Sequence, residues 1–169
     1  EKLGATGIEL KWPNDLIAQD GKLAGILTEV QQQSNDTVTI VTGIGLNVDL
    51  SNAHELGAHA DWARQVIDLK RVCEPLPNPE SIAGALIEQF LDVFAGYEIS
   101  GFMPSAERWS QYDWLRGRKL TIDTTAEHIA GVGCGVDDDG ALLVDTFESG
   151  IRRVSSGTIV SVGERSMAS

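Results

Sequence analysis

The sequence predicts an α+β protein in two parts, with a boundary near residues 112–115. Three observations support this prediction. Before the boundary, extended segments separated by turn signals come first, and helical segments follow them. After it, short strands recur at regular spacing between glycine-containing turns, which is typical of a small barrel. We therefore expect a sheet with helices over residues 1–112 and a small β-barrel domain over residues 113–169.

The first part opens with strands. Residues 8–12 alternate in polarity, and extended structure resumes at residues 16–19 after Pro13, because proline cannot donate to a strand ladder. Asp20-Gly21 indicates a hairpin turn, since glycine accepts positive φ without a Cβ clash. The remaining expected elements of this sheet are a strand over residues 22–31, a polar turn over 32–36 and a nearly continuous apolar strand over 37–44.

Helices are expected in the second half of this part. A short helix is expected around residues 61–70. Asn78 and Pro79 suit the cap and the first position of a longer helix. The apolar side chains on one face of that helix are Ile82, Leu86, Phe90, Phe94 and Tyr97. A further helix is expected over residues 104–112.

The pattern changes to short strands after residue 113. Leu120 and Ile122 alternate with polar residues, and apolar residues alternate with glycine over residues 130–136. Asp139-Gly140 indicates another hairpin turn. The last expected strands cover residues 141–146, 151–154 and 158–162, which gives about five strands in total. Glycines in such strands fit the tight bends of a small barrel.

Charge and composition narrow the classes of function. With 13 basic and 25 acidic residues the net charge is −12, which opposes nucleic-acid binding by this segment because such binding requires cations to neutralise phosphates. No apolar run approaches the roughly 20 residues of a membrane span, and no signal-peptide pattern opens the chain. Cys73 and Cys134 form no CxxC pair, which indicates reduced thiols of a cytoplasmic protein. The three histidines have no metal-ligand spacing, so no metal site is expected on them.

Two lysines of the first part stand out. Lys11 and Lys22 lie within apolar strand sequence, where a cation is costly without an anionic partner. Glu9, Asp15 and Asp20 could be partners within the protein. The alternative is an anionic ligand such as a phosphate or a carboxylate. The residues alone leave both interpretations open.

Glycines and asparagines at the strands give the next signal. Gly25, Gly43 and Gly45 lie inside strand sequence, where glycine is often found at the close approach of a ligand or another backbone. By composition alone, the pair Gly43 and Gly45 indicates a bulge or a strand exit. Asn14 and Asn47 lie at strand ends. An amide offers a donor and an acceptor together, which suits an adenine edge, although asparagine at such a place also suits a turn.

These pieces together resemble a known family. Three segments look like the three consecutive signatures of the biotin–protein ligases, in the same order and at similar spacing: Lys11-Trp12-Pro13-Asn14-Asp15, then Lys22-Leu23-Ala24-Gly25-Ile26-Leu27-Thr28-Glu29, then Gly43-Ile44-Gly45-Leu46-Asn47-Val48. The resemblance continues more weakly through residues 109–113 into Leu115-Arg116-Gly117-Arg118, which looks like the entry to the family's C-terminal barrel.

The resemblance implies a fold and a reaction. It implies part of a catalytic core, a mixed sheet with helices, related to the class II aminoacyl-tRNA synthetases and biotinyl/lipoyl ligases, followed by an SH3-like barrel. In that family, biotin and ATP, with Mg²⁺ carried by ATP, form biotinyl-5′-AMP and pyrophosphate. A lysine of biotin carboxyl carrier protein, a subunit of acetyl-CoA carboxylase, then attacks the adenylate and receives biotin. The resemblance also allows a homodimer.

The resemblance assigns roles to six residues. Lys22 is implied to be the catalytic lysine, in contact with the biotin carboxylate and the bridging phosphate. Gly25 is implied to lie against the biotin ring. The implied nucleotide-binding residues are Lys11, Asn14, Asp15 and Asn47, with both asparagines facing the adenine.

Parts of the family pattern are missing. The glycine- and arginine-rich loop and the strand that binds the biotin ureido group precede these motifs in the family, and the chain opens at Glu1 without them. We therefore expect the C-terminal part of a ligase, inactive on its own. Thr158 and Val162 depart from the family's barrel pattern, which puts a role of the barrel in ATP binding in doubt. The alternative functions are a biotin-sensing transcriptional repressor and a binding module without independent catalysis.

Overall fold

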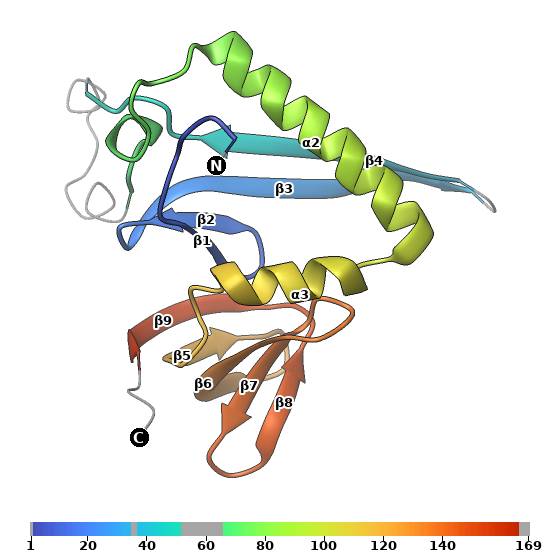
Figure 1. Ribbon diagram of the computed structural model, residues 1–169. Coiled ribbons are helices and arrows are strands. Elements are labelled where there is room, and N and C mark those ends of the chain that lie inside the picture. The colour runs from blue at the N-terminus through green and yellow to red at the C-terminus, as the bar shows by residue number, and fades with distance from the viewer. Residues whose placement is uncertain (1, 35–36, 52–65, 166–169) are drawn as a thin grey trace. The chain divides into compact units, whose positions relative to one another are not determined.

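The computed structural model describes residues 2–34, 37–51 and 66–165 (Figure 1). The chain divides into two compact units, which are described separately below. The first unit comprises Glu1–Glu9 and Asn14–Ile82, and the second comprises Leu10–Pro13 and Ala83–Ser169. The mixture of two sheets and a few helices confirms the predicted α+β class. The domain boundary at residues 112–115 remains a prediction.

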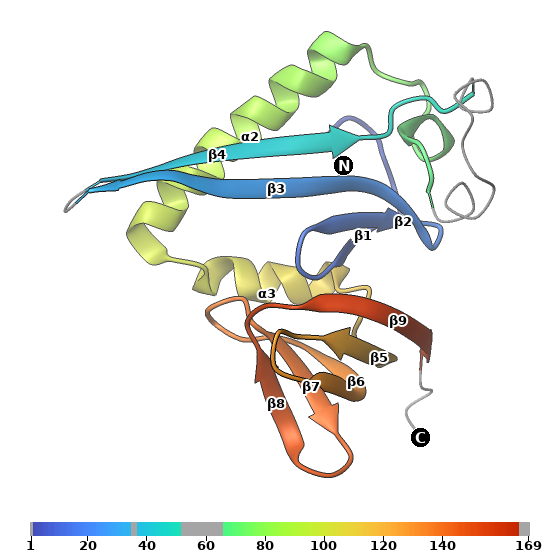
Figure 2. The same ribbon diagram turned by 180° about the vertical axis from the view of Figure 1, so that it is seen from behind.

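A four-stranded sheet lies mainly in the first unit. Its strands, in the order β1-β2-β3-β4, are Ile8–Lys11, Asp15–Ala18, Gly21–Ser34 and Thr37–Leu46; Leu10 and Lys11 at the end of β1 belong to the second unit. The pairs β2–β3 and β3–β4 are antiparallel, so they do not show the mixed sheet that the family resemblance implies. β3 and β4 form a long hairpin that extends well beyond β2 (Figure 2). Residues 32–34 of the polar turn expected over 32–36 belong to β3 instead, and residues 35–36 lie outside the described residues.

The turn between β2 and β3 differs from the prediction. Gln19 and Asp20 have positive φ, at 47° and 60°, and they form the turn; Gly21 is already the first residue of β3. Gly21 is required for a different reason. A Cβ at this position would lie 3.1 Å from Ile67 Cβ and 3.3 Å from Ile67 N. The glycine therefore admits the close approach of another backbone segment, which is the second common use of glycine in a strand.

A buried aspartate organises the segment beyond β4. The short helix predicted around residues 61–70 is seen in the described residues only as a 3₁₀ helix at Leu69–Arg71, and residues 61–65 lie outside them. Asp68 caps this helix: its Oδ1 accepts a hydrogen bond from Arg71 N at 3.2 Å, while its Oδ2 accepts one from Leu50 N at 2.8 Å. Asp68 is buried, and these two hydrogen bonds satisfy its carboxylate oxygens. They also join the two chain segments.

Two helices precede the second sheet. α2 spans Pro79–Ser100, and Asn78 Oδ1 accepts a hydrogen bond from Ser81 N at 2.8 Å, which confirms the predicted cap. α3 spans Met103–Tyr112, as predicted to within one residue. Of the apolar residues on the predicted face of α2, Ile82 is buried, whereas Phe94 and Tyr97 are exposed. None of the helices in the described part of the chain combines the length and the apolarity needed to cross a membrane.

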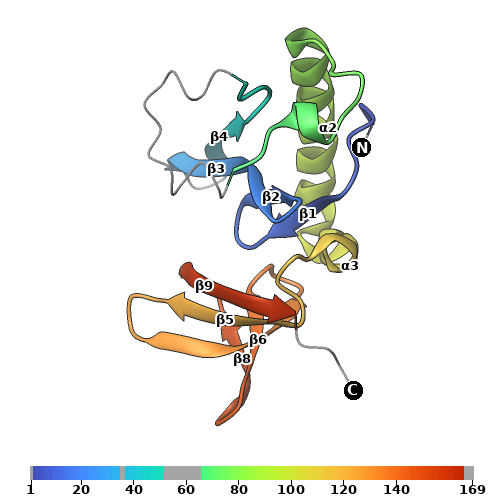
Figure 3. The same ribbon diagram turned by 90° about the vertical axis from the view of Figure 1, so that its left-hand side faces the viewer.

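Five antiparallel strands make up the second sheet, as the sequence predicts. Its order is β8-β7-β6-β5-β9, and Figure 3 shows β9 beside β5. The strands are β5 Arg118–Asp123, β6 His128–Val136, β7 Leu142–Thr146, β8 Gly150–Val154 and β9 Thr158–Arg165. Their core contains Leu115, Ile122, Leu142 and Val144, whose side chains are fully buried. The turn at Asp139-Gly140 is confirmed, with Gly140 at a φ of 85°.

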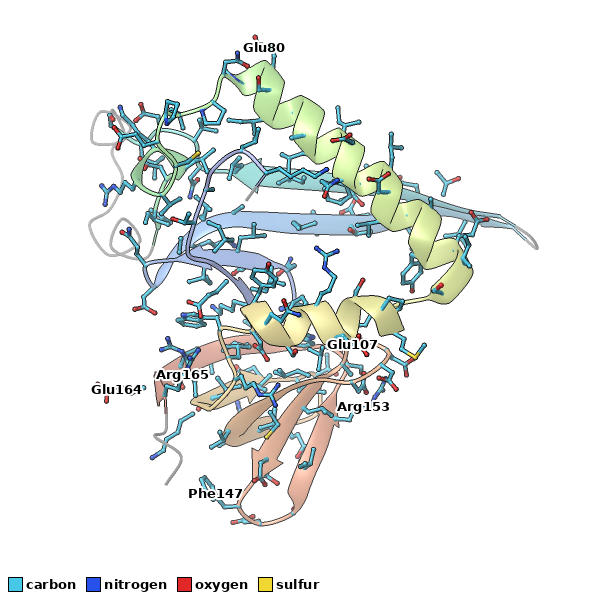
Figure 4. The ribbon with its side chains drawn as sticks, viewed as in Figure 1. Glu80, Glu107, Phe147, Arg153, Glu164 and Arg165 are labelled. Carbon is cyan, nitrogen blue, oxygen red and sulfur yellow. The ribbon has the colours of Figure 1, made fainter. Side chains whose placement is uncertain are left out.

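Outward-facing side chains surround this core. Arg153 of β8 forms ion pairs with Asp137 and Asp139, while Phe147 lies at the tip of the β7–β8 hairpin with 85% of its surface exposed (Figure 4). The ion pairs link β8 to the turn that precedes β7. Exposed pairs of this kind contribute little to stability individually.

Gly131 should be one of the least replaceable residues of the second sheet. A Cβ at Gly131 would collide with the Asp145 carbonyl oxygen and lie 2.7 Å from Val144 Cγ1. Gly131→Ala should therefore lower the free energy of unfolding by about 1–3 kcal/mol, measured by urea denaturation. Gly84→Ala in α2 is the matched control: apart from the backbone of its own helix and its chain neighbours, no atom of the described residues lies within 4 Å of the position that its Cβ would take, and alanine should raise helix stability by up to about 1 kcal/mol. Equal effects of the two substitutions would contradict the close packing at Gly131.

Asp113 should make stability depend on pH in an unusual direction. Burial raises the pKa of this carboxyl above its ordinary value, and Oδ2 is buried without a hydrogen-bond partner among the described residues. A raised pKa in the folded state contributes stability at low pH that is lost as pH rises through that pKa. Relative to wild type, Asp113→Asn should therefore gain stability between about pH 4 and pH 7. Thermal denaturation across this range tests the prediction, with the exposed Asp138→Asn as control; a constant difference would contradict it.

Candidate functional site

One extra residue in β3 determines where Lys22 points. Ile17 of β2 pairs with Lys22, while the preceding Leu16 pairs with Ala24, so Leu23 has no partner on β2. This is a β-bulge. Without it, strand alternation would place Lys22 and Gly25, three positions apart, on opposite faces of the sheet. With the bulge, both residues lie on the same face. Bulges often redirect a side chain in this way.

On this face, Lys22 forms an ion pair with Asp15. Lys22 Nζ lies 2.6 Å from Asp15 Oδ1. Asp15 is paired across the strands with Gly25, so its carboxylate emerges directly beside the glycine. The Lys22 side chain is 46% exposed and that of Asp15 is 19% exposed. Asp15 is thus the protein partner that the sequence left open among three candidates, and the ammonium remains accessible to a ligand.

Gly25 provides the space for this ion pair. A Cβ built on Gly25 would lie 3.2 Å from Lys22 Nζ, 3.3 Å from Lys22 Cε and 3.4 Å from Asp15 Oδ1. The side chains of the pair therefore extend over the position that a larger residue would fill. The sequence suggested a close approach at this glycine, and the side chains of the ion pair make one. The bulge or strand exit was expected at Gly43 and Gly45 instead. Both of these glycines pair in regular register with β3, and β4 ends just after them, at Leu46.

The glycine row continues onto β4. Gly45 pairs with Gly25, and Gly43 pairs with Leu27, so all three glycines share the face that carries Lys22. Among the described residues other than the immediate chain neighbours, no atom lies within 4 Å of a Cβ built on Gly43 or Gly45. We call Gly25, Gly43 and Gly45 the glycine row. It presents bare backbone to a flat or extended ligand, with the Lys22–Asp15 ion pair at one end.

Two hydrogen bonds to its backbone carbonyl hold the main chain of Lys22 in place. Its carbonyl oxygen accepts hydrogen bonds from Ile67 N at 3.0 Å and from Asn47 Nδ2 at 3.1 Å. Asn47 Nδ2 also donates to the Ile67 carbonyl at 3.2 Å, and Asn47 N donates to the Leu23 carbonyl at 3.0 Å. Asn47 therefore joins the end of β4, the bulge in β3 and the segment around Ile67.

Asn14 makes an analogous connection on the other side of Gly25. Asn14 Nδ2 donates to the Ile26 carbonyl at 2.7 Å, and Ile26 N donates to the Asn14 carbonyl at 2.8 Å. Both asparagines thus use their amide nitrogen within the protein. Each retains a side-chain oxygen, which can act only as an acceptor. The structure places Asn14, Asp15, Lys22, Gly25 and Asn47 in one unit, around the start of β3.

Lys11 belongs to the second unit, with Trp12. There the Lys11 ammonium lies 5.9 Å from the centroid of the Trp114 ring, within range of a cation–π interaction. Trp12 is buried, and its Nε1 donates a hydrogen bond to the Gly140 carbonyl at 3.0 Å. The tryptophan of the first motif is therefore a packing residue of that unit, while a nucleotide-binding role of Lys11 remains a prediction.

A second ion pair of the first unit lies beside Asp68. Lys70 Nζ donates to Asp49 Oδ2 at 2.8 Å, and this hydrogen bond is the main reason why the pKa of Asp49 lies well below its ordinary value. Sequence reasoning missed both Asp49 and Asp68. An Asp68-x-x-Arg71 spacing, typical of a helix cap, is the signal that could have indicated Asp68. Among the described residues, no three His, Cys, Asp or Glu side chains gather to form a metal site.

Comparison with known proteins gives consistent results. Residues 1–47 match the biotin/lipoate A/B protein ligase family. The bifunctional ligase/repressor BirA of Escherichia coli is 33% identical over 144 residues, which cover 85% of this chain and 43% of that protein. The biotin–[acetyl-CoA-carboxylase] ligase of Paracoccus denitrificans is 29% identical over 140 residues, which cover 83% of this chain and 58% of that protein. The chain thus spans about half the length of the curated relatives it matches.

Solved structures show the same fold. The biotin protein ligase of Aquifex aeolicus in complex with biotin and ATP superposes with a TM-score of 0.74 at 23% identity, covering 94% of this chain and 62% of that one. A biotin protein ligase-like protein from Silicibacter gives a TM-score of 0.66 at 13% identity, covering 90% and 64%. Residues 1–47 thus match the biotin/lipoate A/B protein ligase family model, and most of the chain is similar in sequence to biotin–protein ligases.

Proposed function

We propose that this chain forms the biotin- and adenylate-binding part of a biotin–protein ligase. The observation that carries the proposal is the placement of the Lys22 ammonium beside Gly25, at the end of a bare glycine row. An acid with a flat ring system needs both features: uncovered backbone for the ring and a fixed cation for the carboxylate. The motifs that supply them resemble, in order and spacing, the signatures of the biotin–protein ligases, which supports the proposal.

The proposed reaction has two steps. The biotin carboxylate attacks the α-phosphorus of ATP, which forms the acyl–phosphate bond of biotinyl-5′-AMP and releases pyrophosphate. A lysine amine of a biotin carboxyl carrier protein then attacks the acyl carbon, loses a proton and displaces AMP, leaving an amide. In the first step negative charge moves from the carboxylate oxygen towards the α-phosphoryl oxygens and the departing pyrophosphate. In the second step it returns to the oxygen that joined the acyl carbon to phosphorus, and this oxygen leaves with AMP. A preorganised cation beside the acyl phosphate lowers both barriers. Lys22 is the residue we assign to this role.

The remaining assigned residues would bind the two substrates. Gly25 would lie against the biotin ring, and Lys11, Asn14, Asp15 and Asn47 would serve the nucleotide. The amide nitrogens of Asn14 and Asn47 already donate to backbone carbonyls, so the free oxygens favour a donor on the ligand. The exocyclic amino group of adenine is such a donor. Mg²⁺ would accompany ATP, bound mainly by phosphate oxygens and water.

Several finer features belong to the same proposal. The first sheet would be part of a class II synthetase-like core, and the five-stranded sheet would close into an SH3-like barrel. The protein would act in the cytoplasm on the carrier subunit of acetyl-CoA carboxylase, and a homodimer is compatible with the proposal. The 169-residue chain would lack independent catalytic activity, because the homologues' residues outside the matched region would be needed to cover the adenylate.

A second candidate function is transcriptional repression controlled by biotin. The Escherichia coli and Bacillus subtilis homologues are named as bifunctional ligase/repressors, which supports this candidate. DNA contact would not come from this segment, whose net charge is −12. Electrophoretic mobility shifts of the full-length gene product, with and without biotin and ATP, would distinguish repression from ligation alone.

Lys22 should be essential for adenylate formation in the full-length gene product. Lys22→Ala should lower pyrophosphate release from biotin and ATP by at least about 100-fold, since one preorganised contact to developing charge commonly contributes about 3 kcal/mol. Lys22→Arg should not restore the rate fully, because the planar guanidinium is larger than the ammonium. Wild-type turnover and biotin affinity in Lys22→Ala would refute the assignment.

Gly25 should be sensitive to the smallest possible enlargement. Gly25→Ala places a methyl group against Lys22 Nζ and Asp15 Oδ1, and it should weaken biotin binding by about tenfold or more, which corresponds to about 1.4 kcal/mol. Isothermal titration calorimetry with biotin measures the effect. Circular dichroism should show an intact fold, because the atoms contacted are the ends of two side chains rather than backbone atoms. If biotin affinity is unchanged while the fold is intact, Gly25 does not line the biotin site.

A further inference from the structure

We infer that Asp15 is a positioning residue for Lys22: it fixes the ammonium over Gly25 and thereby sets the rate of the chemical step without strengthening substrate binding. This inference rests on the proposed function. It differs from the role in nucleotide binding that the family resemblance implies, because Asp15 would act through Lys22 and need not touch a substrate. Three features of the described residues support it.

The first feature is that both ends of Lys22 are held. At the backbone end, its carbonyl oxygen accepts two hydrogen bonds, from Ile67 N and Asn47 Nδ2. At the other end, Nζ lies 2.6 Å from Asp15 Oδ1. A lysine side chain otherwise has large rotamer freedom, and binding a ligand would have to remove it. Here the ion pair restricts that freedom before a ligand arrives, which is the condition for preorganised catalysis.

The second feature is the origin of the carboxylate. Asp15 is the cross-strand partner of Gly25, so the sheet register itself sets the position of the carboxylate beside the glycine. With a side chain only 19% exposed, Asp15 is the less exposed member of the pair, whereas Lys22 is 46% exposed. The anchor is thus the better shielded group, and the cation it holds faces the ligand side.

The third feature is a conflict of charges. An ammonium has three donors, and the contact with Asp15 leaves others for an acyl phosphate. The same carboxylate, however, repels the biotin carboxylate and the phosphates. Removing its charge should therefore leave ground-state affinity for biotin unchanged or improve it, while the released Lys22 loses its fixed position. A residue that merely stabilised the fold would lower both affinity and rate.

The experiment compares Asp15→Asn with Asp49→Asn in the full-length gene product. Asp49→Asn is the matched control, because it removes the same charge from an aspartate–lysine pair of similar length in the same unit, 2.8 Å from Lys70 Nζ. Asp15→Asn should lower kcat for pyrophosphate release about tenfold or more, with KM for biotin unchanged or lowered. Asp49→Asn should leave both constants near wild type.

A second measurement does not depend on activity. Acetylation of Lys22 by an N-hydroxysuccinimide ester, followed by peptide mass spectrometry on the 169-residue chain, reports how firmly the amine is held. Asp15→Asn should accelerate acetylation of Lys22 severalfold, and acetylation of Lys70 should be unchanged. Asp49→Asn should show the reverse pattern.

The outcomes separate the inference from the proposed function. If wild type releases no pyrophosphate and binds no biotin, the proposed function fails, and the acetylation rates alone decide the positioning role. If wild type is active but Asp15→Asn keeps kcat and the acetylation rate of Lys22, the positioning role is refuted and the function stands. A raised KM for biotin in Asp15→Asn with unchanged kcat would instead make Asp15 a binding residue, which also overturns the inference.

Discussion

The arrangement of the candidate site depends on a register constraint in β3. Because Leu23 has no partner on β2, the faces of the strand change at this point, and Lys22 comes to the side of Gly25 and Asp15. Every later feature follows from this change: the ion pair, the space that Gly25 leaves for it and the continuation of the glycine row onto β4. The hydrogen bonds from Asn47 and Ile67 then hold the bulged segment in place.

The site combines groups with opposite requirements. A cation that stabilises a developing charge should be fixed and partly desolvated, while a biotin site should offer flat, uncovered backbone. One face of the sheet offers both features. Gly43 and Gly45 leave β4 without side chains at their positions, and the bulge brings the Lys22 side chain to the same face of β3. The asparagines on either side use their nitrogens to join strands, so they can support the site and present an acceptor oxygen at once.

Much of this could be predicted from the sequence, and the parts that could not share a physical cause. Strand and helix positions followed from periodicity and capping residues, as Asn78 illustrates. The roles of Lys22 and Gly25 as site residues stay predictions. Their proximity in the structure was not predicted, because a bulge changes the alternation on which strand reasoning depends. The turn expected at Asp20-Gly21 lies one residue earlier, at Gln19 and Asp20. Gly21 belongs to β3 instead, where its small size admits the close approach of Ile67. In α2 the apolar face was recognised, but periodicity cannot tell what covers such a face, and part of it is exposed.

The unpaired residue in β3 also has an evolutionary consequence. Substitution at Leu23 changes one buried side chain, and an apolar residue of similar size should be tolerated there. Deletion of the same residue would restore regular alternation and turn Lys22 towards the opposite face of the sheet, away from Gly25. Substitutions between Lys22 and Gly25 should therefore be tolerated, whereas insertions and deletions there should not. Among homologues, the number of residues between these two positions should vary less than the identities of those residues.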